Sequence, residues 1–545
     1  MKKEFKIGMT VESNTEYFAT ESEYHVYAED TVEVSDDRYV ALRAYDTKNF
    51  NVFMLIKDKK NVTLDFGGAT LVMHGKIQPF LVDSCENVTI KNCSVTYERP
   101  SYTEALILDA KTDEYARVRL NKNCPCRIED GRLVPYGDGW ENTRLNVRGC
   151  FYQVFDAKTR LGCGIGLGIM GNNIELDPDW PYNPRHFIAE ADGEDIILKG
   201  RARDYYQPGR VLTISHSGNG GRSLSSIFAI DTKNIRVENY RILSGWAMGF
   251  YSYRVENITL DGFRLTYDEK SPCIVTNAAD AVHTFGTSGV FEIRNSVFEG
   301  MIDDAINIHS NFRTVEHVEG NEIYSHLASC EPQASDLYRV GDEIAVYKGK
   351  TMEEAARYTI KKIELLDNFM SKFTVDRPVE AHEDGDLMES LTANCDVLIE
   401  NCIFGKANSH LRLQSRGKFV MRNCETELIL LLSGDASYWF ESGPLTDFTV
   451  ENCRFVGENA KIRIKSELMP TEAEPYYHKN LKILNCEFDT EAPLKGGYAD
   501  GIVFKGNKNR AGKPMTLTLT NCGSVDADNC TVERKTEVKD KLNYN

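Results

Sequence analysis

Three aspartates within one short stretch carry the strongest chemical signal in the sequence. The segment TNAADAVHTFGTSGVFEIRNSVFEGMIDDAINIHSNF, residues 276–312, contains Asp280 and the pair Asp303 and Asp304. Its phrases ADAVHT and DDAINIH resemble each other and lie 23 residues apart. If that interval is one turn of a repeating fold, the three carboxylates lie together, and their repulsion raises at least one pKa. A protonated acid beside an ionised base is what hydrolysis of a glycosidic bond requires.

Polar side chains with the same spacing flank these acids. His283 follows Asp280, and Asn307 and His309 follow the Asp pair. We expect these three side chains to face the same groove and to contact a substrate there. Carboxyl groups on adjacent turns are compatible with the separation of about 6.5–9.5 Å found in inverting glycosidases. The alternatives for the acids are a solvated turn or a calcium site.

A recurring strand pattern indicates the fold that must position these residues. Copies such as NVTIKNCSV, DVLIENCIF and FTVENCRF alternate apolar and polar residues, as short strands do. In the second half, the Asn of the Asn-Cys pair recurs at 401, 423, 452, 485 and 521. Repeats of this length indicate a solenoid, and two or three short strands per copy favour a right-handed parallel β-helix of the pectin-lyase type over a propeller.

The asparagines of the repeat have a structural explanation. We interpret the glycosylation-like matches as products of the repeat, because asparagine tolerates the left-handed conformation that corners require and can stack into ladders. These matches begin at Asn61, Asn87, Asn92, Asn257 and Asn529.

Two segments interrupt the repeat and divide the chain. Both contain a glycine-centred turn followed by an alternating strand, so we expect small antiparallel, barrel-like β inserts. The predicted organisation is N-terminal coils at 1–100, insert 1 at 101–222, central coils with the acids at 223–311, insert 2 at 312–393, and C-terminal coils and tail at 394–545. Within insert 2, residues 351–362 (TMEEAARYTIKK) are expected to form a helix. The Gly-x-Gly-x-x-Gly string at 166–171 is not interpreted as a dinucleotide site, because prolines interrupt the following residues.

Composition limits the classes of partner. The net charge of −18 argues against a phosphate-backbone partner, and no apolar stretch is long enough to suggest a membrane span. Fifteen cysteines cannot all pair within one chain, so we expect most to be reduced and buried. The N-terminus as written has no signal peptide, which predicts a cytoplasmic protein, or a secreted one if a signal sequence was removed.

The acidic segment also resembles a known family. ADAVHTFGTSGVFEIRNSVFEGMIDDAINIH is similar to the signature of glycoside hydrolase family 110, and GKIQPFLVDSCENVTIKNCSVTYERP resembles its N-terminal coils. This resemblance implies an exo-acting, inverting α-1,3-galactosidase that needs no metal or other cofactor, with Asp280, Asp303 and Asp304 as the catalytic carboxylates. By analogy with the related polygalacturonases, Asp303 would be the general acid, and Asp280 with Asp304 would activate water.

The remaining contacts are predicted from position alone. Trp246 either stacks on galactose or is packed in the interior, and Arg99 either reaches sugar hydroxyls or forms a surface ion pair with Glu98. No basic clamp is evident near the acids, although Arg412 lies in the string LRLQSR, and this favours a neutral sugar over galacturonate. The implied partner is a glycan with terminal α-galactose.

Three other functions stay open. The first is a β-helix glycosidase for another terminal sugar, such as a polygalacturonase-like enzyme. The second is a lyase, which would need calcium or a basic residue near the acids. The third is a solenoid that binds glycans without catalysis. A homodimer is a further open alternative.

Overall fold

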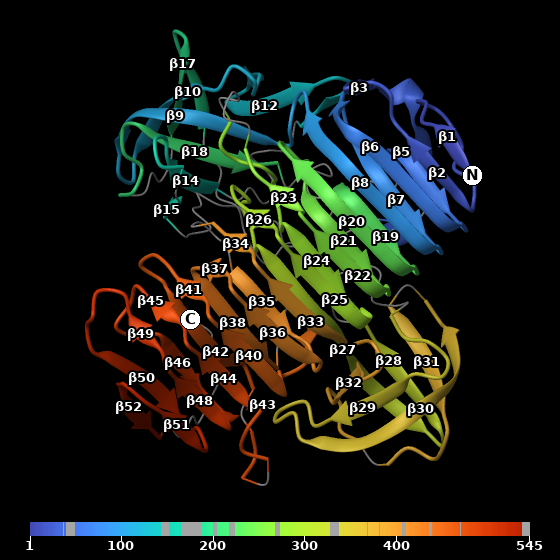
Figure 1. The fold of residues 1–545 in the computed structure, drawn as a ribbon, viewed down its shortest axis with the longest axis vertical. Coiled ribbons are helices and arrows are strands. Elements are labelled where there is room, and N and C mark those ends of the chain that lie inside the picture. Colours follow the sequence, from blue (N-terminus) through green and yellow to red (C-terminus); the bar gives the residue numbers. More distant parts are fainter. Residues whose placement is uncertain are drawn as a thin grey trace.

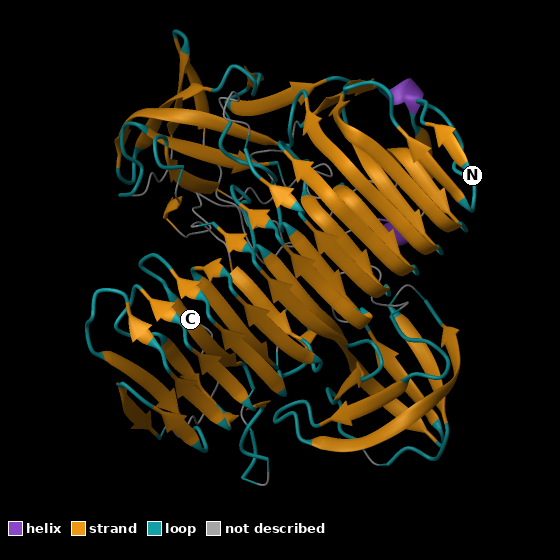
Figure 2. Ribbon diagram, in the orientation of Figure 1, coloured by secondary structure: helices purple, strands orange, loops and turns teal. Residues whose placement is uncertain are grey.

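The computed structural model describes most of the chain. The described residues are 1–35, 37–39, 49–142, 152–160, 162–164, 188–199, 204–216, 224–267, 273–327, 337–367, 369–380, 382–405, 410–434, 439–468, 470–472 and 474–536. Nearly all regular structure in them is β, as Figure 2 shows. The described helical turns are two 3-10 segments, Ala28–Asp30 and Asp37–Tyr39. The Gly-x-Gly-x-x-Gly string lies outside the described residues. No helix in the described part is long and apolar enough to cross a membrane.

Two long parallel sheets form the body of the molecule, a parallel β-helix as expected (Figure 1). The first consists of β2 (Thr15–Phe18), β6 (Lys60–Met73), β8 (Glu86–Tyr97), β20 (Lys233–Ile242), β22 (Glu256–Asp261), β25 (Ser288–Arg294), β33 (Cys395–Glu400), β36 (Lys418–Arg422), β40 (Asp447–Glu451), β44 (Leu481–Leu484), β48 (Ile502–Lys505) and β51 (Val525–Ala527). The second consists of β5 (Asn49–Lys57), β7 (Ile77–Asp83), β19 (Ser225–Ile230), β21 (Met248–Tyr253), β24 (Val282–Phe285), β27 (Ile306–Glu319), β35 (His410–Gln414), β38 (Leu428–Ser433), β42 (Lys461–Ser466), β46 (Leu494–Gly497), β50 (Met515–Thr520) and β52 (Cys530–Lys535).

Short strands continue the turns between these sheets. They are β3 (Glu23–Val26), β23 (Arg264–Leu265), β26 (Val297–Phe298), β34 (Ile403–Phe404), β37 (Glu425–Thr426), β41 (Arg454–Phe455), β45 (Glu487–Phe488) and β49 (Lys508–Asn509). The accessory strands are β1 (Lys2–Glu4), β4 (Val32–Ser35), β43 (His478–Lys479) and β47 (Ala499–Asp500). Inward positions of successive turns hold Val, Ile, Leu and Phe, which form one continuous buried core.

Asparagines occupy the corners, as the sequence predicts. The φ angles of Asn61, Asn87, Asn92, Asn257 and Asn529 are 53°, 58°, 56°, 62° and 54°. The five asparagines of the Asn-Cys pairs also have positive φ. Side chains at one corner form a ladder: Asn87 donates to Asn61 at 2.8 Å, and Asn234 donates to Asn87 at 2.8 Å. Asparagine therefore serves both the corner conformation and the contact between turns.

The cysteines that follow these asparagines point into the core. Cys402, Cys424, Cys453 and Cys486 are at most 3% exposed. The cysteines among the described residues are free thiols, as expected for a chain that uses them as small apolar side chains.

Insert 1 is an antiparallel sheet beside the N-terminal coils. Its seven strands run in the order β15 (Gly162–Gly164), β14 (Tyr152–Asp156), β18 (Arg210–Ser215), β9 (Tyr102–Lys111), β10 (Tyr115–Leu120), β17 (Asp195–Lys199) and β16 (Ile188–Asp192). Three further strands, β11 (Cys126–Glu129), β12 (Arg132–Gly137) and β13 (Trp140–Glu141), form a small separate sheet.

Insert 2 closes into a barrel. Strand β27 continues out of the solenoid and pairs antiparallel with β28 (Glu322–His326) and β32 (Leu387–Ser390). The circle is completed by β31 (Met370–Val375), β30 (Glu354–Leu365) and β29 (Glu343–Tyr347). Figure 1 shows this barrel in yellow beside the later coils.

The helix expected at 351–362 is wrong. Residues 354–365 form strand β30, which pairs with β29 and β31 on its two sides. Glu, Ala and Lys favour a helix locally, but inward-facing Tyr358 and Ile360 are almost completely buried in the barrel. Pairing on both edges of the strand overrides the local preference.

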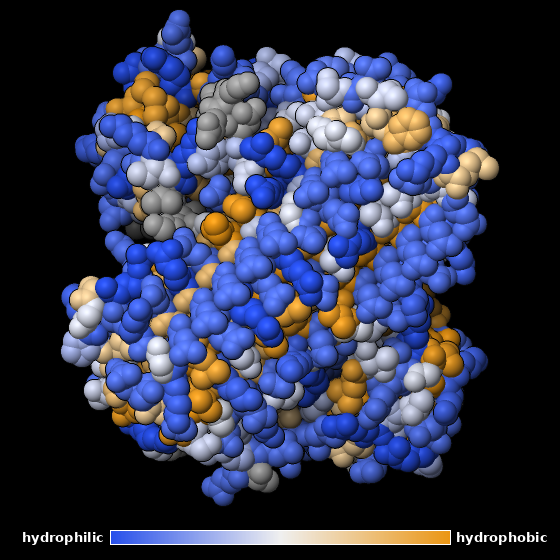
Figure 3. Space-filling model, viewed as in Figure 1, coloured by the Kyte–Doolittle hydropathy of each residue, from blue (hydrophilic) through white to orange (hydrophobic). Residues whose placement is uncertain are grey.

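The exposed surface agrees with the acidic composition. Figure 3 shows hydrophilic side chains over most of the visible face, with hydrophobic residues in scattered groups.

The asparagine ladder gives a test of the corner geometry. Replacing Asn87 by Ala removes two side-chain hydrogen bonds and leaves a residue with a Cβ in the left-handed region, which should cost about 2 kcal/mol. Replacing Asn87 by Gly removes the same bonds but tolerates the conformation. We expect the melting temperature to be highest for the wild type, lower for Asn87→Gly and lowest for Asn87→Ala, measured by differential scanning fluorimetry. An alanine variant as stable as the glycine variant would contradict the role of the corner conformation.

Candidate active site

The three aspartates lie on two adjacent turns of the solenoid. Asp280 precedes β24, and Asp303 and Asp304 precede β27, the strand that pairs next to β24. The backbone N–H of Ala281 donates to the carbonyl of Asp304 at 2.9 Å, so the two acidic segments run in register. Carboxylate oxygens of the three aspartates lie within 4.8 Å of one another. The structure therefore brings together the acids that the 23-residue interval predicts to be neighbours.

The close approach of these oxygens has its origin in the solenoid, because neighbouring parallel strands lie about 4.8 Å apart.

Burial and the closeness of like charges raise the pKa values of Asp280 and Asp304. Burial raises the pKa of Asp280 to about 6, the charge of Asp303 adds to the effect, and the hydrogen bond from His283 opposes it. Burial likewise raises the pKa of Asp304 above its ordinary value, against the opposing contact with His410. Asp303 is the least buried of the three. The cluster thus contains one carboxyl, that of Asp280, that changes protonation state close to neutral pH.

The two predicted histidines join Asp280 in one hydrogen-bonded chain. His283 Nδ1 lies 2.7 Å from Asp280 Oδ2, and His283 Nε2 lies 2.9 Å from His309 Nε2. His309 Nδ1 lies 2.9 Å from the carbonyl oxygen of Ser310. All three residues are at most 5% exposed.

Hydrogen-bond counting places the protons along this chain. A carbonyl oxygen only accepts, so His309 Nδ1 carries a proton. Burial lowers the pKa of His309 to about 4, so this ring is neutral and its Nε2 accepts a hydrogen bond. His283 Nε2 must therefore be the donor to His309. One more proton lies between His283 Nδ1 and Asp280, which gives either an imidazolium beside a carboxylate or a neutral ring beside a carboxylic acid.

Glu441 and Arg412 border this chain, and the sequence gives no signal for Glu441. Strand β39 (Glu441–Ser442) pairs antiparallel with β27. Glu441 Oε1 accepts a hydrogen bond from Asn307 Nδ2 at 3.3 Å and lies 3.7 Å from His309 Nε2. Arg412 lies 2.7 Å from Glu441 Oε2. Burial favours the neutral acid, but the charges of Arg412 and the two histidines, with the hydrogen bond from Asn307, together outweigh it and lower the pKa of Glu441.

Arg412 corrects the expectation that no basic residue lies near the acids. Arg412 lies opposite Asn307 in the pairing of β35 with β27, so it is close to the acids in space. It is far from them in sequence because insert 2 intervenes. Its guanidinium is paired with Glu441, which explains why it adds little net positive charge to the groove.

His410 is a second residue that sequence reasoning missed. Its Nδ1 lies 3.3 Å from Asp304 Oδ1. Burial lowers the pKa of His410, but the contact with Asp304 more than compensates, so the pKa is raised overall. The only signal for this residue is the register of β35 against β27, which the sequence hides behind insert 2. Asp280 and Asp304 thus each have a histidine partner.

Insert 1 holds the backbone of both acidic segments. Glu104 Oε1 accepts hydrogen bonds from the N–H groups of Ile274 and Val275 at 2.9 and 2.8 Å, a few residues before Asp280. Burial raises the pKa of Glu104 to about 8. Gln153 donates to the carbonyl of Ile302 at 2.7 Å, immediately before Asp303.

The two remaining predicted contacts are wrong. Trp246 is 1% exposed and packs against Trp140 and Tyr97, so its ring has no surface to offer a sugar. Arg99 is 2% exposed, and its guanidinium donates to the carbonyls of Pro100 and Tyr102. Both side chains are held in the contact between the solenoid and insert 1, which the sequence pattern does not reveal.

Comparisons with known proteins give relatives but no family model. No family model matches the chain. Over 541 residues, covering 94% of this chain and 84% of the relative, it is 26% identical to Alpha-1,3-galactosidase B of Bacteroides thetaiotaomicron. It is 24% identical over 519 residues to Alpha-1,3-galactosidase A of Bacteroides fragilis, covering 89% of this chain and 81% of the relative.

Solved structures show weaker likeness. The A-module of the Azotobacter vinelandii mannuronan C-5 epimerase AlgE4 has a TM-score of 0.29 and 9% identity, covering 96% of this chain and 89% of that chain. A family 28 exopolygalacturonase of Yersinia enterocolitica also scores 0.29, with 11% identity, covering 98% of this chain and 74% of that chain. The fold assignment rests on the strand pairings described above.

The relatives named alpha-1,3-galactosidase match most of the chain, including both acidic turns. The chain is therefore similar over most of its length to proteins named alpha-1,3-galactosidase, in agreement with the resemblance found in its sequence.

Proposed function

We propose that the protein removes a terminal α-1,3-linked galactose from a glycan, as an exo-acting glycoside hydrolase that inverts the anomeric centre. The observation that carries this proposal is the convergence of Asp280, Asp303 and Asp304 in a homologue of proteins named alpha-1,3-galactosidase. Blood-group-B-type and linear Gal-α-1,3-Gal ends are the proposed substrates.

We infer the roles of the acids from the analogy with polygalacturonases, and the contacts of each acid support this assignment. Asp280 and Asp304 are buried and each contacts a histidine, which favours their ionised forms against burial. Asp303 is the most accessible of the three. In the proposed reaction, Asp303 donates its proton to the glycosidic oxygen as the bond from that oxygen to C1 breaks. A water molecule attacks C1, and the Asp280–Asp304 pair accepts the proton of that water.

Retention is the alternative mechanism. Retaining glycosidases hold their carboxyl groups about 5–5.5 Å apart, and one aspartate would then form a covalent galactosyl intermediate. The stereochemistry of the product separates the two mechanisms.

The first experiment follows the anomer released from galactose-α-1,3-galactose by proton NMR. We expect β-galactose to appear before mutarotation, and Asp303→Asn to lower kcat by about 10²–10⁴-fold, the usual contribution of a positioned acid. Asp526→Asn, an exposed acid paired with Lys505 near the C-terminus, serves as the matched control and should keep full activity.

The other results each have a meaning. Initial release of α-galactose would replace inversion by retention. If neither this substrate nor aryl glycosides of other sugars are cleaved, the glycan-binding solenoid becomes the better explanation.

The pH profile tests the role of Asp280. As a base it must be ionised, so kcat/KM should fall as the pH decreases through about 6, the pKa of this carboxyl. In His283→Phe, loss of the donor to Asp280 should raise its pKa and move this acidic limb upward by about 1–2 pH units. His283→Asn restores an N–H donor and should give an intermediate limb. Loss of activity on the alkaline side of pH 6 would instead make Asp280 the acid.

Trp439 replaces Trp246 as the proposed sugar platform. It is only partly buried and stands two residues before Glu441, on the segment that pairs with β27. An aromatic face with exposed surface can stack on the apolar face of galactose. We expect Trp439→Ala to raise KM about tenfold or more with a smaller change in kcat, and Trp439→Phe to recover most of the loss. Unchanged steady-state kinetics in the alanine variant would remove Trp439 from the substrate site.

A further inference from the structure

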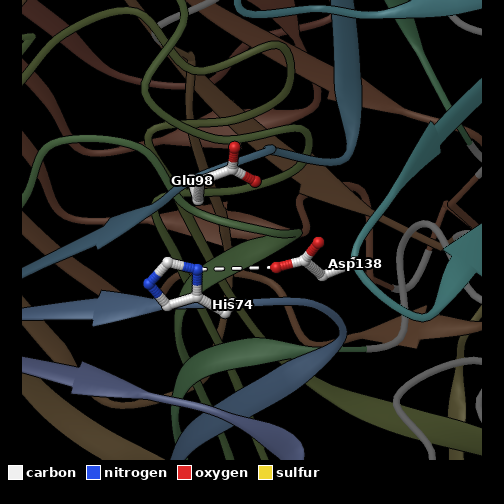
Figure 4. A group of neighbouring side chains, drawn as sticks. All are labelled: His74, Glu98 and Asp138. Carbon is white, nitrogen blue, oxygen red and sulfur yellow. Dashed lines mark ion pairs between the residues drawn. The ribbon is translucent and has the colours of Figure 1, made fainter.

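A second group of convergent side chains lies where insert 1 meets the N-terminal coils. His74 follows β6, Glu98 follows β8 on the next turn, and Asp138 lies in the turn between β12 and β13 of insert 1. One ligand atom from each of the three lies within 4.8 Å of the others, and His74 Nδ1 is 3.6 Å from Asp138 Oδ2. Figure 4 shows the three side chains converging on one space.

The hydrogen bonds behind His74 fix which nitrogen faces the carboxylates. Glu23 Oε1 lies 3.0 Å from His25 Nε2 and can only accept, so that nitrogen carries the proton. His25 Nδ1 lies 2.8 Å from His74 Nε2. This contact leaves His74 Nδ1 as the ring nitrogen that faces Asp138, 3.6 Å from Asp138 Oδ2.

The ring of His74 is also held in place. Tyr27 stacks on it with ring centroids 4.2 Å apart and an interplanar angle of 16°. Gly75 has a φ of +96°, and a Cβ there would lie 2.8 Å from the carbonyl oxygen of Asp138. Glycine therefore lets the turn of insert 1 approach the histidine closely. His74 would be the ligand, and His25 with Glu23 would hold its ring from behind. Metal-binding histidines commonly have such outer hydrogen-bond partners.

We propose that His74, Glu98 and Asp138 bind a divalent transition-metal ion of the Zn²⁺ class. One imidazole nitrogen and two carboxylate oxygens are ligands that Zn²⁺ accepts, whereas Ca²⁺ takes oxygen ligands. Tetrahedral coordination at about 2.1 Å puts neighbouring ligand atoms about 3.4 Å apart, close to the His74–Asp138 distance. Asp138 is 63% exposed, so an ion can enter from solvent and keep an open coordination position.

This site is separate from the catalytic carboxylates. His74 precedes β7, and β7, β19, β21 and β24 are successive neighbours in one sheet. Three strand spacings of about 4.8 Å separate its turn from that of Asp280, or roughly 14 Å. Because Asp138 belongs to insert 1 and the other ligands to the solenoid, the ion ties the insert to the coils.

The test measures binding of Zn²⁺ alone to the full chain by isothermal titration calorimetry, after treatment with chelator. All variants carry Asp303→Asn, which lowers metal binding at the catalytic carboxylates. We expect one Zn²⁺ site in this background, its loss in His74→Gln, and affinity reduced about 10–100-fold in His25→Gln, the outer-partner variant. His317→Gln is the matched control. His317 is an exposed histidine of insert 2 whose ring stacks on Tyr324, as the ring of His74 stacks on Tyr27.

Several results would overturn the proposal. No Zn²⁺ binding at millimolar concentration would mean that a proton, as a simple ion pair of His74 with Asp138, occupies the space. Equal binding in His74→Gln and the control would place the ion elsewhere. Binding of Ca²⁺ as tight as that of Zn²⁺ would make the site a carboxylate cluster in which His74 takes no part. Melting curves confirm that each variant is folded, and an anomalous signal at the zinc edge locates the ion independently of affinity.

Discussion

The spacing between hydrogen-bonded parallel strands governs the rest of this molecule. Each turn of the solenoid must lie about 4.8 Å from the next, because backbone N–H and C=O groups pair only at that distance. Residues about one turn apart in sequence are therefore forced into contact. Asp280 and Asp304 are neighbours for this reason, and so are His74 and Glu98, whose turns pair Met73 with Tyr97. The fold creates clusters of like charge that the chain must then stabilise with other groups.

Histidines and one arginine provide that stabilisation at the cluster of aspartates. Each carboxyl contacts a basic side chain. Asp280 contacts His283, Asp304 contacts His410, and Glu441 contacts Arg412. A buried carboxylate without such a partner would be protonated at neutral pH, as Glu104 is, where burial raises the pKa to about 8. The histidine partners favour the ionised forms of Asp280 and Asp304 against the effect of burial. The acids and their basic partners must lie close together. Adjacent turns of the solenoid bring them together without long loops.

The sequence predicts the features that repeat from one turn of the solenoid to the next. It does not predict the contacts that depend on the inserts. The strand alternation, the corner asparagines and the Asp280–Asp303 interval are local or periodic, so they can be read directly. His410 is one turn from Asp304 in space, but more than a hundred residues lie between them in sequence, most of them in insert 2. The expected helix in that insert fails for the same reason, since its strand depends on partners on both sides. Trp246 shows that a residue type near a site does not reveal whether its surface is covered.

The inserts are therefore part of the site even though the acids stand on the solenoid. Parallel pairing fixes the height of each acidic segment but not its path before the strand begins, where the chain has no repeating partner. Insert 1 supplies partners at these points: Glu104 holds residues 274 and 275, and Gln153 holds Ile302. Strand β39 supplies Glu441 from the other side. A solenoid alone brings the carboxylates to adjacent turns, and the extra segments fix the backbone that aims them.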